Sequence, residues 1–160
     1  MCASNDINLD SDDMYGILIL LHILGATVWT GGHLILAFTI LPRVLRERSP
    51  AELMRFESAY ERIGLPALII QIITGLMLAY RLVPDPARWI DPGDVAGRLV
   101  GVKLLLLATT AAFALDARLR VIPNLNEGKL VSMAWHIIPV TFIGVLFVVV
   151  GVSFRTGWFY

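Results

Sequence analysis

The chain has 160 residues, 57% of them hydrophobic, and a mean hydropathy of +0.73. This composition excludes an ordinary soluble domain and indicates an integral membrane protein folded as one bundle. Thirteen Lys and Arg residues balance thirteen Asp and Glu residues, so the formal net charge is zero. The charge therefore gives no indication of a nucleic acid partner.

The first fourteen residues are polar and acidic, and they are predicted to form a flexible tail. This tail lacks the basic start and short apolar stretch of a cleavable signal peptide. Its Cys2 is the single cysteine of the chain, so no internal disulfide can form. Residues 15–160 are predicted to form a single transmembrane domain.

Four apolar segments are long enough to cross a bilayer core about 30 Å thick, which needs roughly 17–25 residues per helix. The predicted spans are residues 15–41, 63–80, 99–115 and 130–154. The amphipathic residues 51–62 are expected to continue the second helix toward its N-terminus. Prolines are expected to mark the exits of the first three spans (Pro42, Pro84, Pro123) and to lie inside spans two and four (Pro66, Pro139). The predicted fold class is all-α, a membrane-embedded four-helix bundle.

Basic residues are divided unequally between the two sides of these spans. Eight lie in the connections between spans one and two and between spans three and four: Arg43, Arg46, Arg48, Arg55, Arg62, Arg118, Arg120 and Lys129. Four lie on the opposite side: Arg81, Arg88, Arg98 and Arg155. The positive-inside rule therefore predicts that both termini lie outside the cytoplasm. In a bacterium, this orientation predicts a multi-pass protein of the inner membrane.

All three histidines of the chain, His22, His33 and His136, lie inside predicted spans. An ionisable or metal-binding side chain within a membrane is costly, and it is therefore a candidate functional residue. His22 and His33 are eleven residues apart in one helix, which is close to three whole turns. Both rings should therefore project from nearly the same face, with an axial separation of roughly 16 Å.

The chain direction of each span predicts the depth of these residues. His33 and His136 are expected to share the cytoplasmic half, whereas Lys103 should lie with His22 in the outer half. Two histidines on different helices are how membrane bundles hold b-type heme, so His33 and His136 are predicted to ligate heme b or another metal ion. Gly25, Trp29 and Gly32 lie on the same stripe of the first span as its histidines. The glycines are predicted to admit a flat macrocycle, with close helix packing as the alternative.

His22 has no histidine partner at its own depth. It is predicted to be an axial ligand, a proton carrier, or the only protein ligand of an iron or copper ion, with Met77 as one candidate second axial ligand. The ammonium of Lys103 is predicted either to pair with a heme propionate or to extend along its alkyl chain to the membrane interface. One or two hemes are therefore expected, and copper is an alternative.

Several short motifs resemble those of one membrane protein family. They are LHILGATVWTGG at residues 21–32, LPR at 41–43, GLP at 64–66, TGL at 74–76, VKL at 102–104 and PV at 139–140. The chain resembles the CopD-like proteins, which are grouped with copper resistance, and their relatives, the HemJ-type protoporphyrinogen oxidases. HemJ-type enzymes rely on a first-helix histidine and a third-helix lysine and are thought to bind heme b. The resemblance implies those roles for His22 and Lys103, while His33 and His136 depart from that pattern.

These features together predict a heme-b-binding membrane redox protein. It would move electrons from a quinol-type donor to a periplasmic acceptor, either copper or an oxygen species. Two alternatives stay open: a copper-binding or copper-transporting protein that uses the histidines directly, and a HemJ-like protoporphyrinogen IX oxidase in which His22 and Lys103 are catalytic. A non-catalytic accessory subunit and a homodimer with heme at its interface are also open. The sequence contains no nucleotide-binding motif, which excludes a nucleotide-driven pump within this chain.

Overall fold

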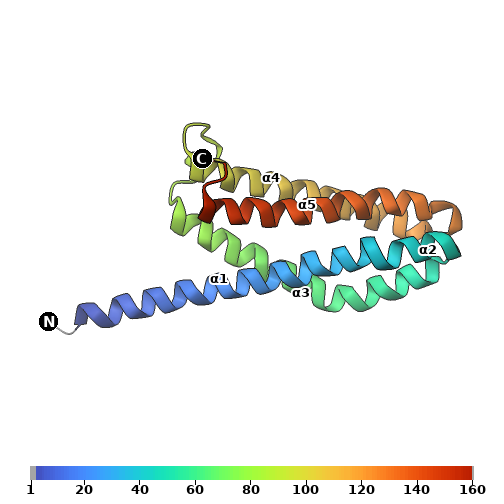
Figure 1. Cartoon of the computed structure of the whole chain (residues 1–160), viewed down its shortest axis with the longest axis horizontal. Coiled ribbons are helices and arrows are strands. Elements are labelled where there is room, and N and C mark those ends of the chain that lie inside the picture. Colours follow the sequence, from blue (N-terminus) through green and yellow to red (C-terminus); the bar gives the residue numbers. More distant parts are fainter. Residues whose placement is uncertain (1–2, 160) are drawn as a thin grey trace.

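The computed structural model describes residues 3–159, with side chains from Asp12 onward. All regular secondary structure in this part of the chain is helical, as predicted (Figure 1). The elements are α1 (Ala3–Ile35), η1 (Leu36–Ile40), α2 (Leu41–Glu47), α3 (Pro50–Leu82), η2 (Pro86–Ile90), α4 (Val95–Asp116), η3 (Ala117–Val121), η4 (Ile122–Asn124), η5 (Glu127–Lys129) and α5 (Leu130–Thr156).

Within the described residues, four helical segments are long and apolar enough to cross a membrane, which confirms the predicted number of spans. They are Asp12–Glu47, Pro50–Leu82, Val95–Asn124 and Glu127–Thr156, and each is longer than its predicted counterpart. The predicted flexible tail lies partly outside the described residues, and from Ala3 onward its backbone belongs to α1. The protein is therefore a multi-pass membrane protein.

The four long helices form two pairs. α1 crosses α3, α4 lies beside α5, and α1 also packs against α5, which joins the pairs (Figure 1). We call the end formed by α2, the start of α3 and η3–η5 the α2 end. The opposite end, which contains η2, is the η2 end, and there α1 extends beyond the other helices (Figure 1).

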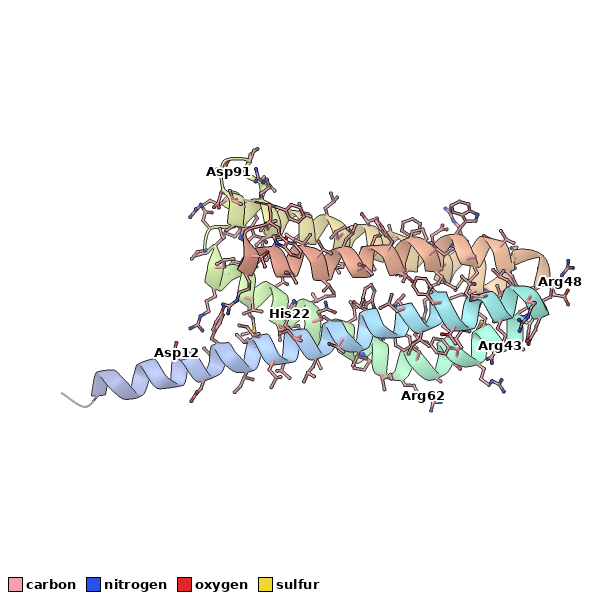
Figure 2. The ribbon with its side chains drawn as sticks, viewed as in Figure 1. Asp12, His22, Arg43, Arg48, Arg62 and Asp91 are labelled. Atoms are coloured by element: carbon pink, nitrogen blue, oxygen red, sulfur yellow. The ribbon has the colours of Figure 1, made fainter. Side chains whose placement is uncertain are left out.

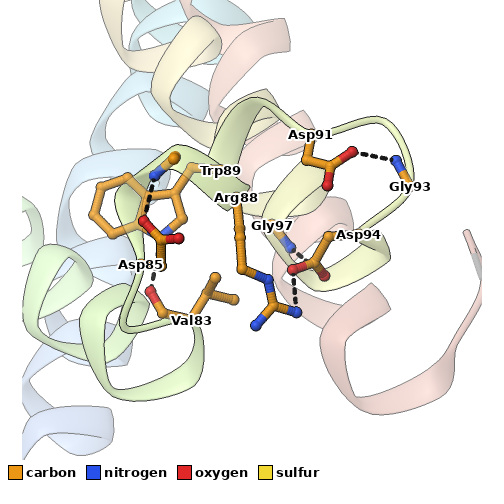
Figure 3. Close-up of polar contacts among 9 residues, drawn as sticks. Val83, Asp85, Arg88, Trp89, Asp91, Gly93, Asp94 and Gly97 are labelled. Atoms are coloured by element: carbon orange, nitrogen blue, oxygen red, sulfur yellow. Dashed lines mark hydrogen bonds and ion pairs between the residues drawn. The ribbon is translucent and has the colours of Figure 1, made fainter.

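Buried apolar side chains form a separate cluster at each end of the bundle. The larger cluster lies at the α2 end: Leu36, Leu41, Val44, Leu53, Ala117, Val121, Leu130, Met133, Ala134 and Ile137. The smaller cluster lies at the η2 end: Val83, Trp89 and Val100. Trp89 also donates its indole hydrogen to the Val83 carbonyl at 2.9 Å, which ties η2 to the end of α3 (Figure 3).

Side-chain caps fix the loop at the η2 end (Figure 3). The Asp85 carboxylate accepts from the backbone N–H of Ala87 at 3.0 Å, at the start of η2. The Asp94 carboxylate accepts from the N–H of Gly97 at 3.1 Å and pairs with Arg88 at 2.6 Å. Both aspartates therefore satisfy N–H groups that the helix starts leave without an intrahelical partner.

Pro42, the predicted exit of the first span, lies within a continuous helical stretch of the chain. A π-helical turn, η1, precedes it, and the helical chain continues through α2 to Glu47. Proline has no N–H to donate, and the wider turn ahead of it absorbs the missing hydrogen bond. Helix α2 ends at Glu47, and the residue that caps it, Arg48, has a left-handed φ of 50°. Pro66 and Pro139 lie inside α3 and α5, as predicted.

Candidate functional site

His22 projects from α1 onto α3, where two oxygens hold one of its ring nitrogens (Figure 2). Its Nδ1 lies 3.0 Å from the Gln71 carbonyl oxygen and 3.1 Å from Thr74 Oγ1. A carbonyl oxygen can only accept a hydrogen bond, so Nδ1 carries the hydrogen and donates it. This tautomer leaves the lone pair of Nε2 free, which is the atom a metal ion would bind.

The ring of His22 lies directly over Gly75 of α3. A Cβ atom built at Gly75 would lie only 2.9 Å from Cε1 of His22. Any larger residue at this position would displace the ring from its two oxygens. The glycine of the TGL motif is therefore required for the position of His22.

Lys103 lies on α4, near His22. Its Nζ lies against α5, where a Cβ built at Gly151 would be 3.4 Å away and the Phe154 ring centroid is 5.4 Å away. Lys103 and His22 therefore lie in the same part of the bundle, close enough for an electrostatic interaction between their side chains.

Two buried polar atoms near these residues lack a hydrogen-bond partner among the described residues. They are Oε1 of Gln71 and Oγ1 of Thr110. Gln71 is the residue whose carbonyl orients His22, and Thr110 lies seven residues after Lys103, on the same face of α4. An unpaired buried polar atom costs about 1–3 kcal/mol.

His33 lies in an aromatic cluster formed by α1, α3 and α5. Its Nδ1 donates to the Trp29 carbonyl at 2.9 Å, and its ring centroid is 4.4 Å from that of Trp29 and 5.8 Å from that of Tyr60. Tyr60 donates its hydroxyl hydrogen to the same Trp29 carbonyl at 2.9 Å. The buried Trp29 ring packs against Gly144 of α5. Trp29 is therefore a packing partner of His33 in this structure.

His136 faces α4. Its Nδ1 lies 2.8 Å from the Ser132 carbonyl oxygen, and its Nε2 lies 2.9 Å from Oδ2 of Asp116. The other carboxylate oxygen of Asp116 pairs with Arg120 at 3.0 Å. Both ring nitrogens of His136 are therefore engaged, which leaves neither free for a metal ion.

The structure does not bring His33 and His136 together. The face of α5 that meets His33 carries Thr141, whose hydroxyl lies 3.2 Å from the His33 carbonyl oxygen. His136 is five residues away from Thr141, a rotation of roughly 140° around the helix. The two rings therefore face different helices, and this packing does not support a heme shared between them. Equal depth in the bundle does not imply a common face.

The glycines on the stripe of α1 pack against α3. A Cβ on Gly25 would lie 2.9 Å from the Ala67 carbonyl oxygen, and one on Gly32 would lie 2.1 Å from Cε2 of Tyr60. The space that was predicted to admit a flat macrocycle is thus filled by α3. Close helix packing, the alternative reading of these glycines, explains them in this structure.

The donor set distinguishes between kinds of metal centre. Within the part of the chain that the structure describes, no group of three or more His, Cys, Asp or Glu side chains could hold a metal ion. Among the described residues, at most one further side chain of these types could therefore join His22 at a copper ion. Heme would bring its own four pyrrole nitrogens, so a single imidazole and a nearby cation would suit it better. The residues around His22 fit a heme by this chemistry. Met77, the candidate second axial ligand, is 46% exposed.

Three functional candidates in the structure were missed by the sequence analysis. Gln71 orients His22 through its main chain, which leaves no side-chain signal. Tyr60 covers Gly32 from a helix remote in sequence. Asp116 was detectable, because it is a carboxylate at the end of the third predicted span, at the same end of the bundle as His136.

Comparison with known families identifies most of this domain. The model of CopD, copper resistance protein D, matches residues 50–154, which include Lys103 and His136 but not the histidines of α1. No curated protein and no solved structure matches the chain. The matched region covers about two thirds of the sequence, from the start of α3 to near the end of α5. The chain therefore belongs to the CopD family of copper resistance proteins.

Proposed function

We propose that this CopD-family protein binds heme b through Nε2 of His22 and acts as a redox protein in the membrane. The observation that carries the proposal is the orientation of the His22 ring. The Gln71 carbonyl and the Thr74 hydroxyl engage Nδ1, so that the opposite nitrogen keeps its lone pair. Metal-binding histidines are typically oriented by such a hydrogen bond from the other ring nitrogen.

The protein's own residues have separate tasks in this proposal. Gln71 and Thr74 hold the tautomer of His22, and Lys103 supplies a positive charge for a propionate in a medium of low dielectric constant. When bound, the heme would supply one-electron chemistry. The protein would take electrons from a quinol-type donor in the bilayer and pass them to copper or an oxygen species. Membership in a copper resistance family supports copper as the acceptor.

The direct handling of copper is a second candidate function. It is favoured by the family and by the equivalent tautomers of His22 and His33, each of which donates from Nδ1 to a backbone carbonyl. Both Nε2 atoms then offer a lone pair at two levels of α1.

A HemJ-like oxidation of protoporphyrinogen IX would use His22 and Lys103, the same pair as the heme proposal.

The optical spectrum and the metal content of the purified protein test these candidates. The heme proposal predicts a Soret band and a sharp α band on reduction. A colourless protein that retains copper would contradict it and would support the direct handling of copper. Anaerobic addition of protoporphyrinogen IX with an excess of a soluble quinone as electron acceptor tests the third candidate. The HemJ-like reaction would pass six electrons and six protons to three quinones and form fluorescent protoporphyrin with purified wild-type protein, and not with Lys103→Met.

A further inference from the structure

A pocket of about 230 Å³ lies between α4 and α5, away from His22. It is lined by Thr109, Ala112, Phe113, Asp116 and His136. The four α4 residues are spaced i, i+3, i+4 and i+7, so they form one face of that helix. His136 reaches this face from α5 and places its ring centroid 5.9 Å from that of Phe113.

The polar end of this pocket accepts hydrogen bonds. His136 has both nitrogens engaged, by the Ser132 carbonyl and by Asp116. Thr109 donates its hydroxyl hydrogen to the Leu105 carbonyl at 2.8 Å. The Asp116 carboxylate offers about four lone-pair sites, and its contacts with His136 and Arg120 use two of them. With its side chain 39% exposed, Asp116 can accept from a ligand hydroxyl.

The depth of the pocket favours a ligand that arrives from the bilayer. His136 is six residues into α5, roughly 9 Å along the axis from the start of that helix. This depth lies within the span, which extends over Glu127–Thr156. A lipid-soluble molecule can reach this level from the acyl-chain region, whereas a phospholipid headgroup lies nearer the helix end.

We propose that this pocket binds the ring of a lipid-soluble quinol. A quinol hydroxyl donates to the Asp116 carboxylate, the ring packs on Phe113, and His136 and Arg120 hold the carboxylate in place. The oxidised quinone has carbonyl acceptors in place of the hydroxyl donors, so it binds more weakly. The inference rests on the proposed function for its biological purpose, since that function requires a quinol-type donor. The binding itself does not involve His22.

Photolabelling of the protein in lipid nanodiscs tests this site. The probe is a hydroquinone with a ring-attached diazirine, kept reduced with ascorbate, and the labelled peptides are identified by mass spectrometry. We expect labelling of residues 109–116 and of the segment around His136. Tetramethylhydroquinone should displace the probe at a concentration about tenfold or more below that of its dimethyl ether, because the ether lacks the donated hydrogen.

Two carboxylate variants provide a matched comparison. Asp116→Asn should weaken the displacement by tetramethylhydroquinone about tenfold or more, because a neutral amide accepts a weaker hydrogen bond. Glu61→Gln removes another carboxylate at the same end, one that pairs with Arg118 outside this pocket, and should leave displacement unchanged. If Asp116→Asn does not fold, the comparison of hydroquinone with ether on wild-type protein still decides the question.

Two results would overturn the inference: labelling spread evenly over the lipid-exposed helices, or equal displacement by the hydroquinone and its ether. The second result would mean that acyl chains or any apolar ring fill the pocket. His22→Ala separates this inference from the proposed function, because labelling should persist in that variant. A heme-free wild-type protein that is labelled here would contradict the heme proposal and support the quinol site.

Discussion

The Nδ1 atom of His22 lies 3.0 Å from the carbonyl oxygen of Gln71, a residue of a different helix. The other two histidines donate from Nδ1 to the carbonyl four residues earlier in their own helices, at Trp29 and Ser132. The ring of His22 is therefore positioned by the contact between α1 and α3. This contact makes the orientation of His22 a property of the bundle, and it supports His22 as the residue that binds a cofactor.

Removal of the Thr74 hydroxyl should weaken cofactor binding without abolishing it. Thr74→Val deletes one of the two oxygens near Nδ1 of His22 and keeps the Gln71 carbonyl. Loss of such an orienting contact typically costs 10–100-fold in metal affinity, and we expect about tenfold because one acceptor remains. Heme titration of the apoprotein measures the change. Thr27→Val is the control, since the Thr27 hydroxyl bonds to Ile23 of its own helix. Equal affinities in both variants would contradict this role of Thr74.

Replacement of Lys103 should shift the midpoint potential of the bound heme. A nearby positive charge stabilises the reduced heme, which carries one more electron. Lys103→Met is therefore expected to move the potential to more negative values, and Lys103→Arg to restore most of it. Spectroelectrochemical titration in nanodiscs measures both variants. A potential that is the same in all three proteins would show that the ammonium does not act on the heme.

A methyl group at Gly25 should destabilise the contact between α1 and α3. The Cβ of Gly25→Ala would lie 2.9 Å from the Ala67 carbonyl oxygen, a backbone atom that cannot rotate away. Overpacking of this kind costs about 1–3 kcal/mol. The control is Gly31→Ala on the same helix, where a Cβ would meet nothing within 4 Å. Thermal unfolding in detergent should show a lower midpoint for Gly25→Ala alone. Equal midpoints for the two variants would contradict the close approach of the helices.

Hydropathy was sufficient to predict the number of spans, and chain direction matches His22 with Lys103 in depth. Depth follows from the position of a residue along its span, so residues on different helices can be matched in level. Rotation about the helix axis could not be predicted in the same way. A helix that is apolar on all sides carries no periodic signal for its inward face. His136 was for this reason matched with His33, although it faces Asp116 on α4.

Tertiary packing accounts for the remaining differences. The sequence indicates a helix end at Pro42, but the buried neighbours Leu36, Leu41 and Val44 keep the chain helical across it. The stripe of Gly25 and Gly32 allows two readings, a cofactor surface or a helix contact. Residues on α3 decide between them, and the sequence of α1 alone does not identify those residues.

The membrane orientation predicted from the basic residues is open to a direct test. In a Cys2→Ser background, Ser49→Cys marks the α2 end and Gly93→Cys marks the η2 end. The positive-inside rule predicts that an impermeant maleimide added to intact cells labels position 93 and leaves position 49 unlabelled. Lysed cells serve as the control, in which both positions should react. Labelling of position 49 in intact cells would reverse the orientation.

The heme content per polypeptide of two histidine variants tests the central claim most directly. Wild-type protein, His22→Ala and His136→Ala are purified in parallel, and heme is quantified as its pyridine complex. We predict that His22→Ala loses most of its heme, because the oriented axial nitrogen is gone, whereas His136→Ala retains the wild-type amount. Full retention of heme in His22→Ala, together with its loss in His136→Ala, would contradict the assignment of the cofactor to His22.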